Sequence, residues 1–249
     1  MERLFTVALE AMDAAFQDYA AALPKPERVR QGDGWNYRFK TQDVYHAVVL
    51  KLALVQSALR AALILNSSGY VMEQGMLQRV IDEANEDILF LVYAITNDTI
   101  TELHLRYLAA FWAEEFGDFD NPTDSHQSRD MVKREKIRAY LARIEGKNPD
   151  PSTAVKVTKV VSKVYSGFVH GASPHIMEIY GGDPPHFHTR GVLPRIPEYQ
   201  RDLANYIYRG LLSHIFAAKL FGSQTHVDTL MKFKQTMEQA MGSDFATKP

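Results

Sequence analysis

Hydrophobic residues recur at helical spacing along most of the chain. Apolar side chains three or four residues apart lie on one face of an α-helix. The pattern predicts helices at about 2–22, 41–66, 72–96, 99–116, 129–145, 151–170, 198–221 and 223–241. Thr41 is the expected N-cap of the second segment. Asp150 followed by Pro151 is the expected start of the sixth, because proline is favoured at the first helical position.

The sixth segment is the one place where helix and strand compete, because its valines favour strands. Its apolar positions recur in steps of three and four, so a helix is predicted. Two polar stretches, around Gly32 and at 118–130, predict loops. Residues 171–197 are rich in glycine, proline and histidine, and predict a long irregular loop with a short helix near 175–179. Residues 242–249 predict a frayed tail.

Together these elements predict an all-α fold. The expected architecture is a single helical domain spanning 1–249, a bundle of seven or eight helices with one long irregular loop. The composition, with 46% hydrophobic and 23% charged residues, is typical of a globular protein.

Charge and cysteine content exclude several function classes. The formal net charge of −2 provides no overall positive field, which disfavours nucleic acid as a partner. The chain has no cysteine, which excludes disulfides, thiol nucleophiles and thiolate zinc sites. Residues 47–65 are the most apolar, but Lys51, Gln56 and Arg60 interrupt them too often for a membrane span. No signal peptide is recognisable, so we expect a cytoplasmic protein without a membrane partner.

The first candidate site is a stripe on the third predicted helix, formed by Arg79, Glu83 and Glu86. It is either a solvent-exposed face, with Arg79 and Glu83 as an i,i+4 ion pair, or one wall of a pocket. The pocket interpretation is supported by residues 88–95, which are apolar all round and carry the helix into the core. Carboxylates covered there would have to meet cations, metals or hydrogen-bond donors.

The second candidate is the end of the sixth helix and the loop after it, which hold Tyr165, His170 and His175. Loops with aromatic and titratable residues frequently carry function. His170 lies near a helix C-terminus, where the helix dipole stabilises its cationic form. The alternative is that His170 and His175 form hydrogen bonds with backbone carbonyls and organise the loop.

A metal ion is a less favoured occupant of the same loop. His175, Glu178, His186 and His188 offer imidazole and carboxylate ligands of the kind that zinc and iron accept. Their spacing matches no metal motif of known geometry. The sequence contains no phosphate-binding glycine loop, dinucleotide fingerprint or serine nucleophile motif, and no cofactor is expected.

The third candidate is the pair Arg209 and His214 on the seventh predicted helix. An arginine and a histidine together can hold a phosphodiester and move protons during its cleavage. Five helical steps place the two side chains about 140° apart, and His214 shares its stripe with apolar residues, so a buried core histidine is the alternative. The basic residues of the fifth segment, including Arg134 and Arg138, predict a solvent-exposed face.

Two resemblances rest on these residues. A helix with Arg79-x-x-x-Glu83, followed by a Tyr-x-x-Phe-Val-His-Gly segment at 165–171, resembles loosely related, functionally uncharacterised all-helical bacterial families. This resemblance implies a helical fold and no particular activity. Through Arg209 and His214 alone, the chain is similar to helical nuclease-like domains of bacterial defence and toxin systems, which carry an Arg-x(4–6)-His motif and act as dimers on RNA.

We expect a homo-oligomer that binds a small polar or anionic molecule between helices. The walls of the expected pocket are Arg79, Glu83 and Glu86 on one side, and Tyr165, His170 and His175 on the other. One alternative is an RNA-binding or RNA-cleaving domain that uses Arg209 and His214. Another is a structural or partner-binding module without enzymatic activity. The sequence leaves open whether any reaction is catalysed.

Overall fold

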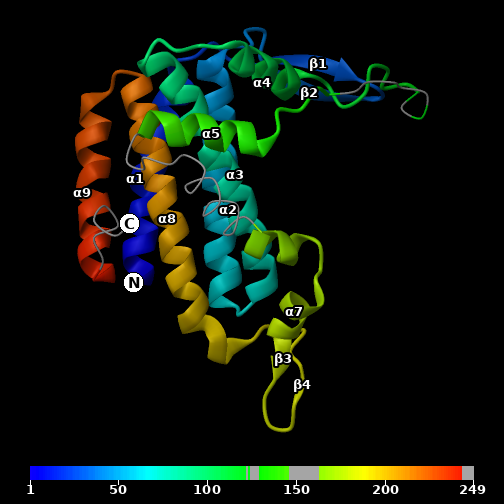
Figure 1. Cartoon of the computed structure of the whole chain (residues 1–249), viewed down its shortest axis with the longest axis vertical. Coiled ribbons are helices and arrows are strands. Elements are labelled where there is room, and N and C mark those ends of the chain that lie inside the picture. The colour runs from blue at the N-terminus through cyan, green and yellow to red at the C-terminus, as the bar shows by residue number, and fades with distance from the viewer. Residues whose placement is uncertain (122, 124–128, 146–162, 243–249) are drawn as a thin grey trace.

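Five long helices form the body of the protein. The computed structural model describes residues 1–121, 123, 129–145 and 163–242. The long helices are α1 (Glu2–Ala21), α2 (Val44–Ser67), α3 (Val71–Thr96), α8 (Ile196–Leu220) and α9 (Gln224–Met241). The shorter helices are α4 (Glu102–Trp112) and α5 (Arg134–Glu145), and residues 163–169 are also helical. Figure 1 shows the long helices side by side, with α5 lying across the bundle.

The predicted all-α fold is confirmed, because the protein is a single, mostly helical body. The helix ends differ from the prediction by a few residues. The second helix begins at Val44, where the Asp43 side chain accepts a hydrogen bond from the His46 backbone nitrogen at 3.0 Å. Thr41 is therefore not its N-cap; Asp43, two residues later, satisfies an N–H group of the first turn instead. The predicted start of the sixth helix at Asp150 and Pro151, and residues 243–249 of the predicted tail, lie outside the described residues.

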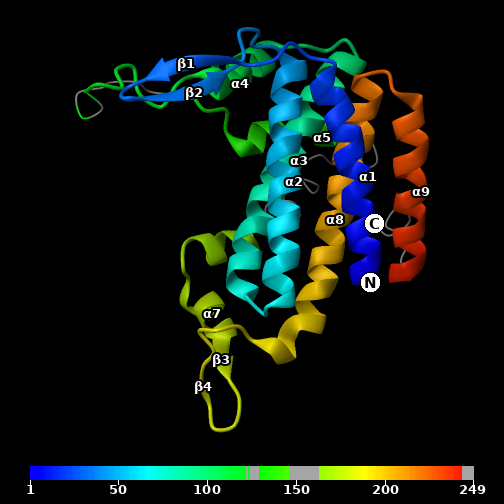
Figure 2. The same ribbon diagram turned by 180° about the vertical axis from the view of Figure 1, so that it is seen from behind.

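Two small hairpins occur where loops were predicted. Strand β1 (Glu27–Gln31) pairs antiparallel with β2 (Gly34–Arg38), and Gly32 in the turn has φ +56°, which suits glycine. The stretch at 171–197 contains α7 (Ser173–Ile176), 3₁₀ turns at Met177–Ile179 and Leu193–Arg195, and a hairpin of β3 (Tyr180–Gly181) and β4 (His186–Phe187). The short helix expected near 175–179 is present as α7 and the 3₁₀ turn after it. Figure 2 shows the two hairpins projecting at opposite ends of the bundle.

Helix α3 is central, because it packs against α2, α5 and α8. Its residues 88–95 are apolar all round, and Ile88, Phe90 and Leu91 are fully buried. Among the described residues, α2 is the one helix that is long and apolar enough to cross a membrane by length and composition. A core helix passes the same test, and α2 packs against α1, α3 and α8, so this observation is weak evidence for a membrane.

Candidate functional site

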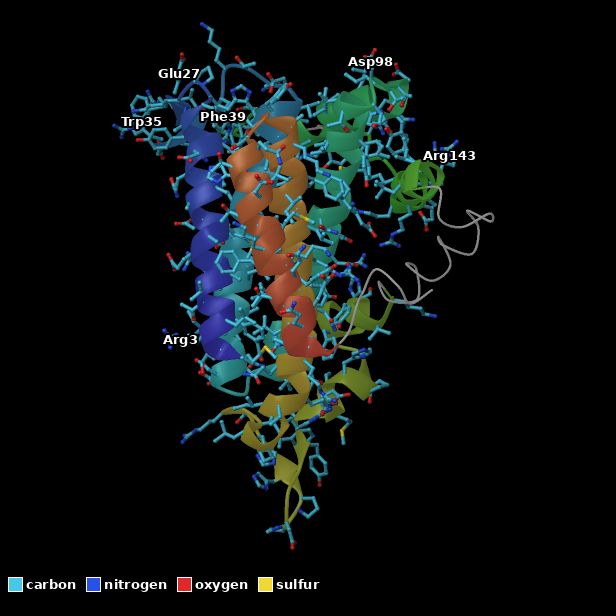
Figure 3. The ribbon with its side chains drawn as sticks, turned by 90° about the vertical axis from the view of Figure 1, so that its left-hand side faces the viewer. Arg3, Glu27, Trp35, Phe39, Asp98 and Arg143 are labelled. Carbon is cyan, nitrogen blue, oxygen red and sulfur yellow. The ribbon has the colours of Figure 1, made fainter. Side chains whose placement is uncertain are left out.

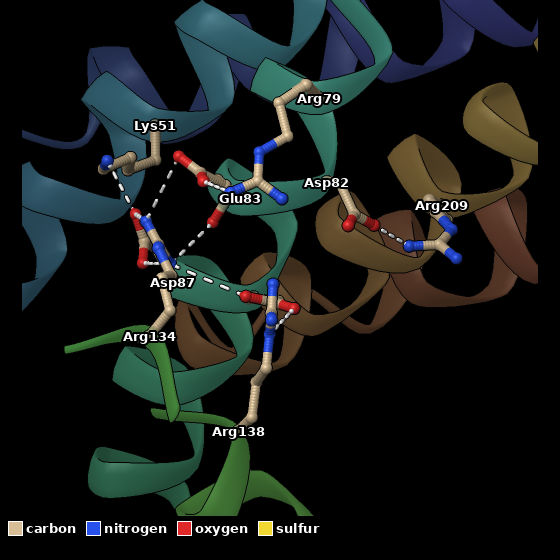
Figure 4. A network of polar contacts seen from close by, with 9 residues as sticks. Lys51, Arg79, Asp82, Glu83, Asp87, Arg134, Arg138 and Arg209 are labelled. Carbon is tan, nitrogen blue, oxygen red and sulfur yellow. Dashed lines mark hydrogen bonds and ion pairs between the residues drawn. The ribbon is translucent and has the colours of Figure 1, made fainter. Parts of the chain in front are cut away.

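Four carboxylates lie together on the middle of α3, and each of them meets a cation. Five basic residues on α2, α3, α5 and α8 supply the cations (Figure 4). We call these nine residues the α3 charge network: Asp82, Glu83, Glu86, Asp87, Lys51, Arg79, Arg134, Arg138 and Arg209. Covered carboxylates on this helix were expected to meet cations, metals or hydrogen-bond donors, and all four meet cations.

The fully buried carboxylate of Asp87 holds two cations. Its oxygens accept hydrogen bonds from Arg134 at 2.5 and 3.1 Å, and Lys51 Nζ lies 2.7 Å from Oδ2. Arg134 also lies 3.9 Å from Glu83 and 3.7 Å from Glu86. Burial lowers the pKa of Arg134, but the neighbouring carboxylate of Asp87 outweighs this and raises it. The bidentate contact fixes the orientation of the guanidinium, which stays charged.

The pair of Glu86 and Arg138 is also buried. Arg138 Nε donates a hydrogen bond to Glu86 Oε1 at 2.7 Å, and the two residues are 6% and 5% exposed, respectively. Burial raises the pKa of Glu86, against the lowering effect of Arg138. The solvent-exposed face predicted for the fifth helix is therefore wrong at Arg138, which is buried, and at Arg134, which is mostly covered. These arginines face α3 because its carboxylates need partners in a low-dielectric interior.

A recess of about 300 Å³ opens next to Asp87, between α2, α3, α4 and α5. Its cations are Lys51, Arg134 and Arg129, and Arg129 also forms an ion pair with Glu115 at 3.0 Å. Tyr107 lines the recess, and its hydroxyl is buried. Burial, and then the charge of Asp87 and a hydrogen bond with that carboxylate, raise the pKa of this hydroxyl, so it stays protonated. The recess therefore presents positive charge.

The residues expected to form two walls of one pocket lie in separate surroundings. Arg79 forms an ion pair with Glu83, and α5 rather than the 165–175 segment faces Glu83 and Glu86. Tyr165 packs edge-on against Tyr206 and lines a second recess of about 520 Å³ with Asn85 and Arg209.

The two histidines of the expected pocket differ in exposure. His170 is exposed, whereas the ring of His175 packs against Phe168 with centroids 4.5 Å apart. A Cβ atom at Gly167 would lie 2.1 Å from Cε1 of His175, so this glycine allows the histidine to approach the helix. His175 therefore organises the loop by packing.

Three of the residues named as possible metal ligands, Glu178, His186 and His188, have polar partners within the protein. Glu178 forms an ion pair with Arg195 and accepts a hydrogen bond from the Tyr199 hydroxyl at 3.2 Å. His186 Nδ1 lies 2.9 Å from the backbone oxygen of Pro184, and His188 Nε2 lies 3.2 Å from that of Gly181. Within the part of the chain that the structure describes, no three His, Asp or Glu side chains are grouped as a metal site.

The side chains of Arg209 and His214 project from different faces of α8. His214 is fully buried; its Nδ1 lies 2.7 Å from the Gly210 carbonyl oxygen and its Nε2 lies 3.3 Å from the Gln56 amide nitrogen. Burial lowers the pKa of His214 to about 4. Arg209 forms an ion pair with the buried carboxylate of Asp82 instead. The structure thus agrees with the alternative of a core histidine and does not bring the two side chains together.

No family model, curated protein or solved structure matches the chain. The two resemblances noted from the sequence therefore stay predictions, and a function has to be argued from the geometry.

Proposed function

We propose that the protein binds a small anionic molecule in the recess next to Asp87. The observation that supports this is an excess of positive charge. Lys51, Arg129 and Arg134 face the recess, and Asp87 is the carboxylate that lines it. Arg129 is paired with Glu115, and Lys51 and Arg134 share Asp87, so three positive charges meet two negative charges and one positive charge is left for a ligand.

The chemistry of the recess suits a phosphate or carboxylate group. Guanidinium and ammonium groups bind such an anion through charge-assisted hydrogen bonds. Arg134 is already bonded to Asp87 through two nitrogens, so it contributes its charge, and Lys51 and Arg129 are the expected donors. Glu83, Glu86 and Asp87 hold Arg134 in place before any ligand arrives, which reduces the entropic cost of binding. In this proposal the α3 carboxylates position the arginine. A volume of about 300 Å³ is at the lower end for ligand pockets and suits a compact molecule.

The test is the thermal stability of the purified protein with inorganic phosphate, glycerol phosphate or succinate, at an ionic strength kept constant with chloride. A ligand that binds only the folded state raises the midpoint of unfolding in a saturable way. We expect at least one of these anions to do so. Lys51→Gln, which removes the excess positive charge, should weaken the effect. Arg60→Ala, which breaks the ion pair with Glu10 away from the recess, is the control and should not.

Two outcomes would contradict the proposal. One is the absence of any saturable rise beyond that caused by chloride. The other is an equal rise in a Lys51→Gln variant, in which Arg134 still pairs with Asp87 and the excess positive charge is gone. RNA cleavage by Arg209 and His214 is the less favoured function, because His214 is fully buried. The expected homo-oligomer stays a prediction.

A further inference from the structure

One face of the β1–β2 hairpin presents two aromatic rings and two arginines to solvent. In the register of the hairpin, Arg28 lies opposite Tyr37 and Arg30 lies opposite Trp35. Directly opposed residues point to the same side of a sheet, as do residues two apart on one strand. The four side chains therefore share one face, which we call the Trp35 face. Trp35 is 59% exposed and Tyr37 is 63% exposed.

The opposite face of the hairpin attaches it to the body. Arg38, on that face, donates two hydrogen bonds to Glu114 just after α4, at 2.5 and 2.8 Å. Val29 and Gln31 on the same side are partly buried, whereas Arg28 and Arg30 are exposed. This attachment keeps the Trp35 face turned outward, and Figure 3 shows Trp35 at the edge of the molecule, away from the bundle.

The charge of the hairpin differs in sign from that of the whole chain. Residues 25–40 contain five basic and two acidic side chains, whereas the chain carries a formal net charge of −2. The guanidinium carbon of Arg28 lies 4.8 Å from the centroid of the Trp35 ring. This cation–π contact orders the ring and covers part of one of its faces, and Trp35 as a whole stays more than half exposed. A polyanion with flat, exposed groups is complementary to such a surface.

We propose that the Trp35 face binds single-stranded nucleic acid. Bases stack on Trp35 and Tyr37, and the backbone phosphates lie against Arg28 and Arg30. Aromatic rings beside cations are the usual means of binding single strands without sequence preference, because every base has a π-face. Residues two apart on a strand are about 6.6 Å apart, which leaves each ring room for its own base. In a duplex the bases are already stacked on one another and cannot occupy these rings.

A hollow beside Tyr37 extends this surface toward the body. It measures about 360 Å³ and is lined by Tyr37, Phe39, Phe111 and Trp112 among other residues. A base that leaves the stack next to Tyr37 meets aromatic walls there.

The experiment uses the fluorescence of Trp35. The chain has two tryptophans, so in a Trp112→Phe variant Trp35 is the sole reporter. Titration with a 12-nucleotide oligo(dT) at low salt should quench its emission, because the bases stack on the indole. Fluorescence anisotropy of a labelled oligo(dT) with the unsubstituted protein gives the affinity without the Trp112→Phe substitution. The double variant Trp35→Ala/Tyr37→Ala should bind about tenfold more weakly or worse.

Salt dependence separates the roles of the arginines from those of the rings. Each phosphate neutralised on a single strand contributes a slope of about −0.7 to the plot of log K against log salt. Arg28→Ala/Arg30→Ala should therefore reduce the magnitude of the slope by about 1.4. Matched controls are Arg3→Ala/Arg143→Ala, which removes the same charge elsewhere (Figure 3), and Phe187→Ala, which removes an exposed ring of the other hairpin. Both should bind as the unsubstituted protein does.

Several outcomes would overturn the proposal. They are an absence of quenching at low salt, unchanged affinity in Trp35→Ala/Tyr37→Ala, and equal affinity for a duplex of the same length. Vesicles of phosphatidylcholine and phosphatidylserine at 3:1 provide a further arm. A blue shift of Trp35 emission with these vesicles, without quenching by oligo(dT), would identify a membrane-binding face instead.

Discussion

At the scale of single residues, burial decides what a polar side chain can do. His214 has the chemistry of a proton carrier, but the interior keeps its ring neutral and bonded to α8. Lys51 appears in the sequence only as an interruption of an apolar segment. In the structure it is a partner of the buried Asp87. A single lysine in an otherwise apolar helix is therefore a signal for a buried carboxylate elsewhere in the chain.

The pH dependence of stability should report on His214. The pKa is about 4 in the folded protein and near 6.5 in an unfolded chain. Between these values the unfolded state binds more protons, so the contribution of His214 is complete above pH 6.5 and is lost as the pH falls toward 4. We expect a loss of roughly 3 kcal/mol in the free energy of unfolding over this range.

Urea unfolding at pH 7, 6 and 5 measures this effect. His214→Gln should flatten the dependence on pH, even if the variant is less stable throughout. His170→Gln, which replaces an exposed histidine, should leave the dependence as it is. An unchanged slope in His214→Gln would show that other groups take up the protons.

The sequence predicted that the α3 carboxylates need partners, but it did not predict which residues these partners are. The need of Glu83 and Glu86 for partners followed from the apolar residues 88–95 after them. The identity of the partners did not, because Arg134 and Arg138 lie some fifty positions away on a helix that is polar enough to suit full exposure. Periodicity places a side chain on a face of its own helix, and which face is covered depends on tertiary packing.

At the scale of elements, the long helices could be predicted because their apolar stripes repeat over many turns. The β1–β2 hairpin was not predicted, since most of its residues are exposed and β1 has a single apolar residue, Val29. The alternation of Trp35, Tyr37 and Phe39 with polar residues is short, and it lies in a stretch rich in glycine and charge. The short helix α7 and the β3–β4 hairpin lie in a stretch whose composition is that of a loop. Their order comes from contacts such as that between His175 and Phe168.

Contact between α3 and the helical residues 163–169 depends on Gly75. Alanine is about 1 kcal/mol more favourable than glycine in a helix interior. At this position, however, a Cβ atom would lie 2.7 Å from Cγ of Phe168, so the ring would have to move. We expect Gly75→Ala to lower the free energy of unfolding by about 1–3 kcal/mol, the usual cost of overpacking.

Urea unfolding of Gly75→Ala, alone and with Phe168→Leu, tests this expectation. The smaller side chain should restore part of the loss, because the two positions are in contact and their effects are not additive. A gain of stability in the single variant would mean that residues 163–169 do not pack against α3 in solution.

At the scale of the whole molecule, the β1–β2 hairpin is an appendage of the bundle. Within the described residues, 24–43 contribute no side chain to the main apolar core, and Arg38 with Glu114 is the prominent link to the body. Regions with few buried apolar contacts open locally without global unfolding. The helices and the hairpin should therefore differ in stability.

Replacement of residues 27–38 by a short Gly-Ser linker should leave the midpoint of thermal unfolding within a few degrees of its original value. In native-state hydrogen exchange, the amides of the β1–β2 ladder should exchange faster than those of α3 and α8. A large fall in the midpoint, or equal protection of the hairpin and α3, would show that the hairpin is part of the cooperative unit.

The α3 charge network also determines how the central helix can be oriented. Residues 88–95 of α3 are apolar on every side, so hydrophobic contact alone would accept several rotations of the helix about its axis. Asp87, Glu86 and Asp82 face cations on α2, α5 and α8, respectively, and a rotation by one residue would separate all three pairs. Unpaired charges in the interior are costly, so those alternatives are strongly disfavoured. The ion pairs thereby select a single rotation of α3 from among those that non-directional hydrophobic packing would allow.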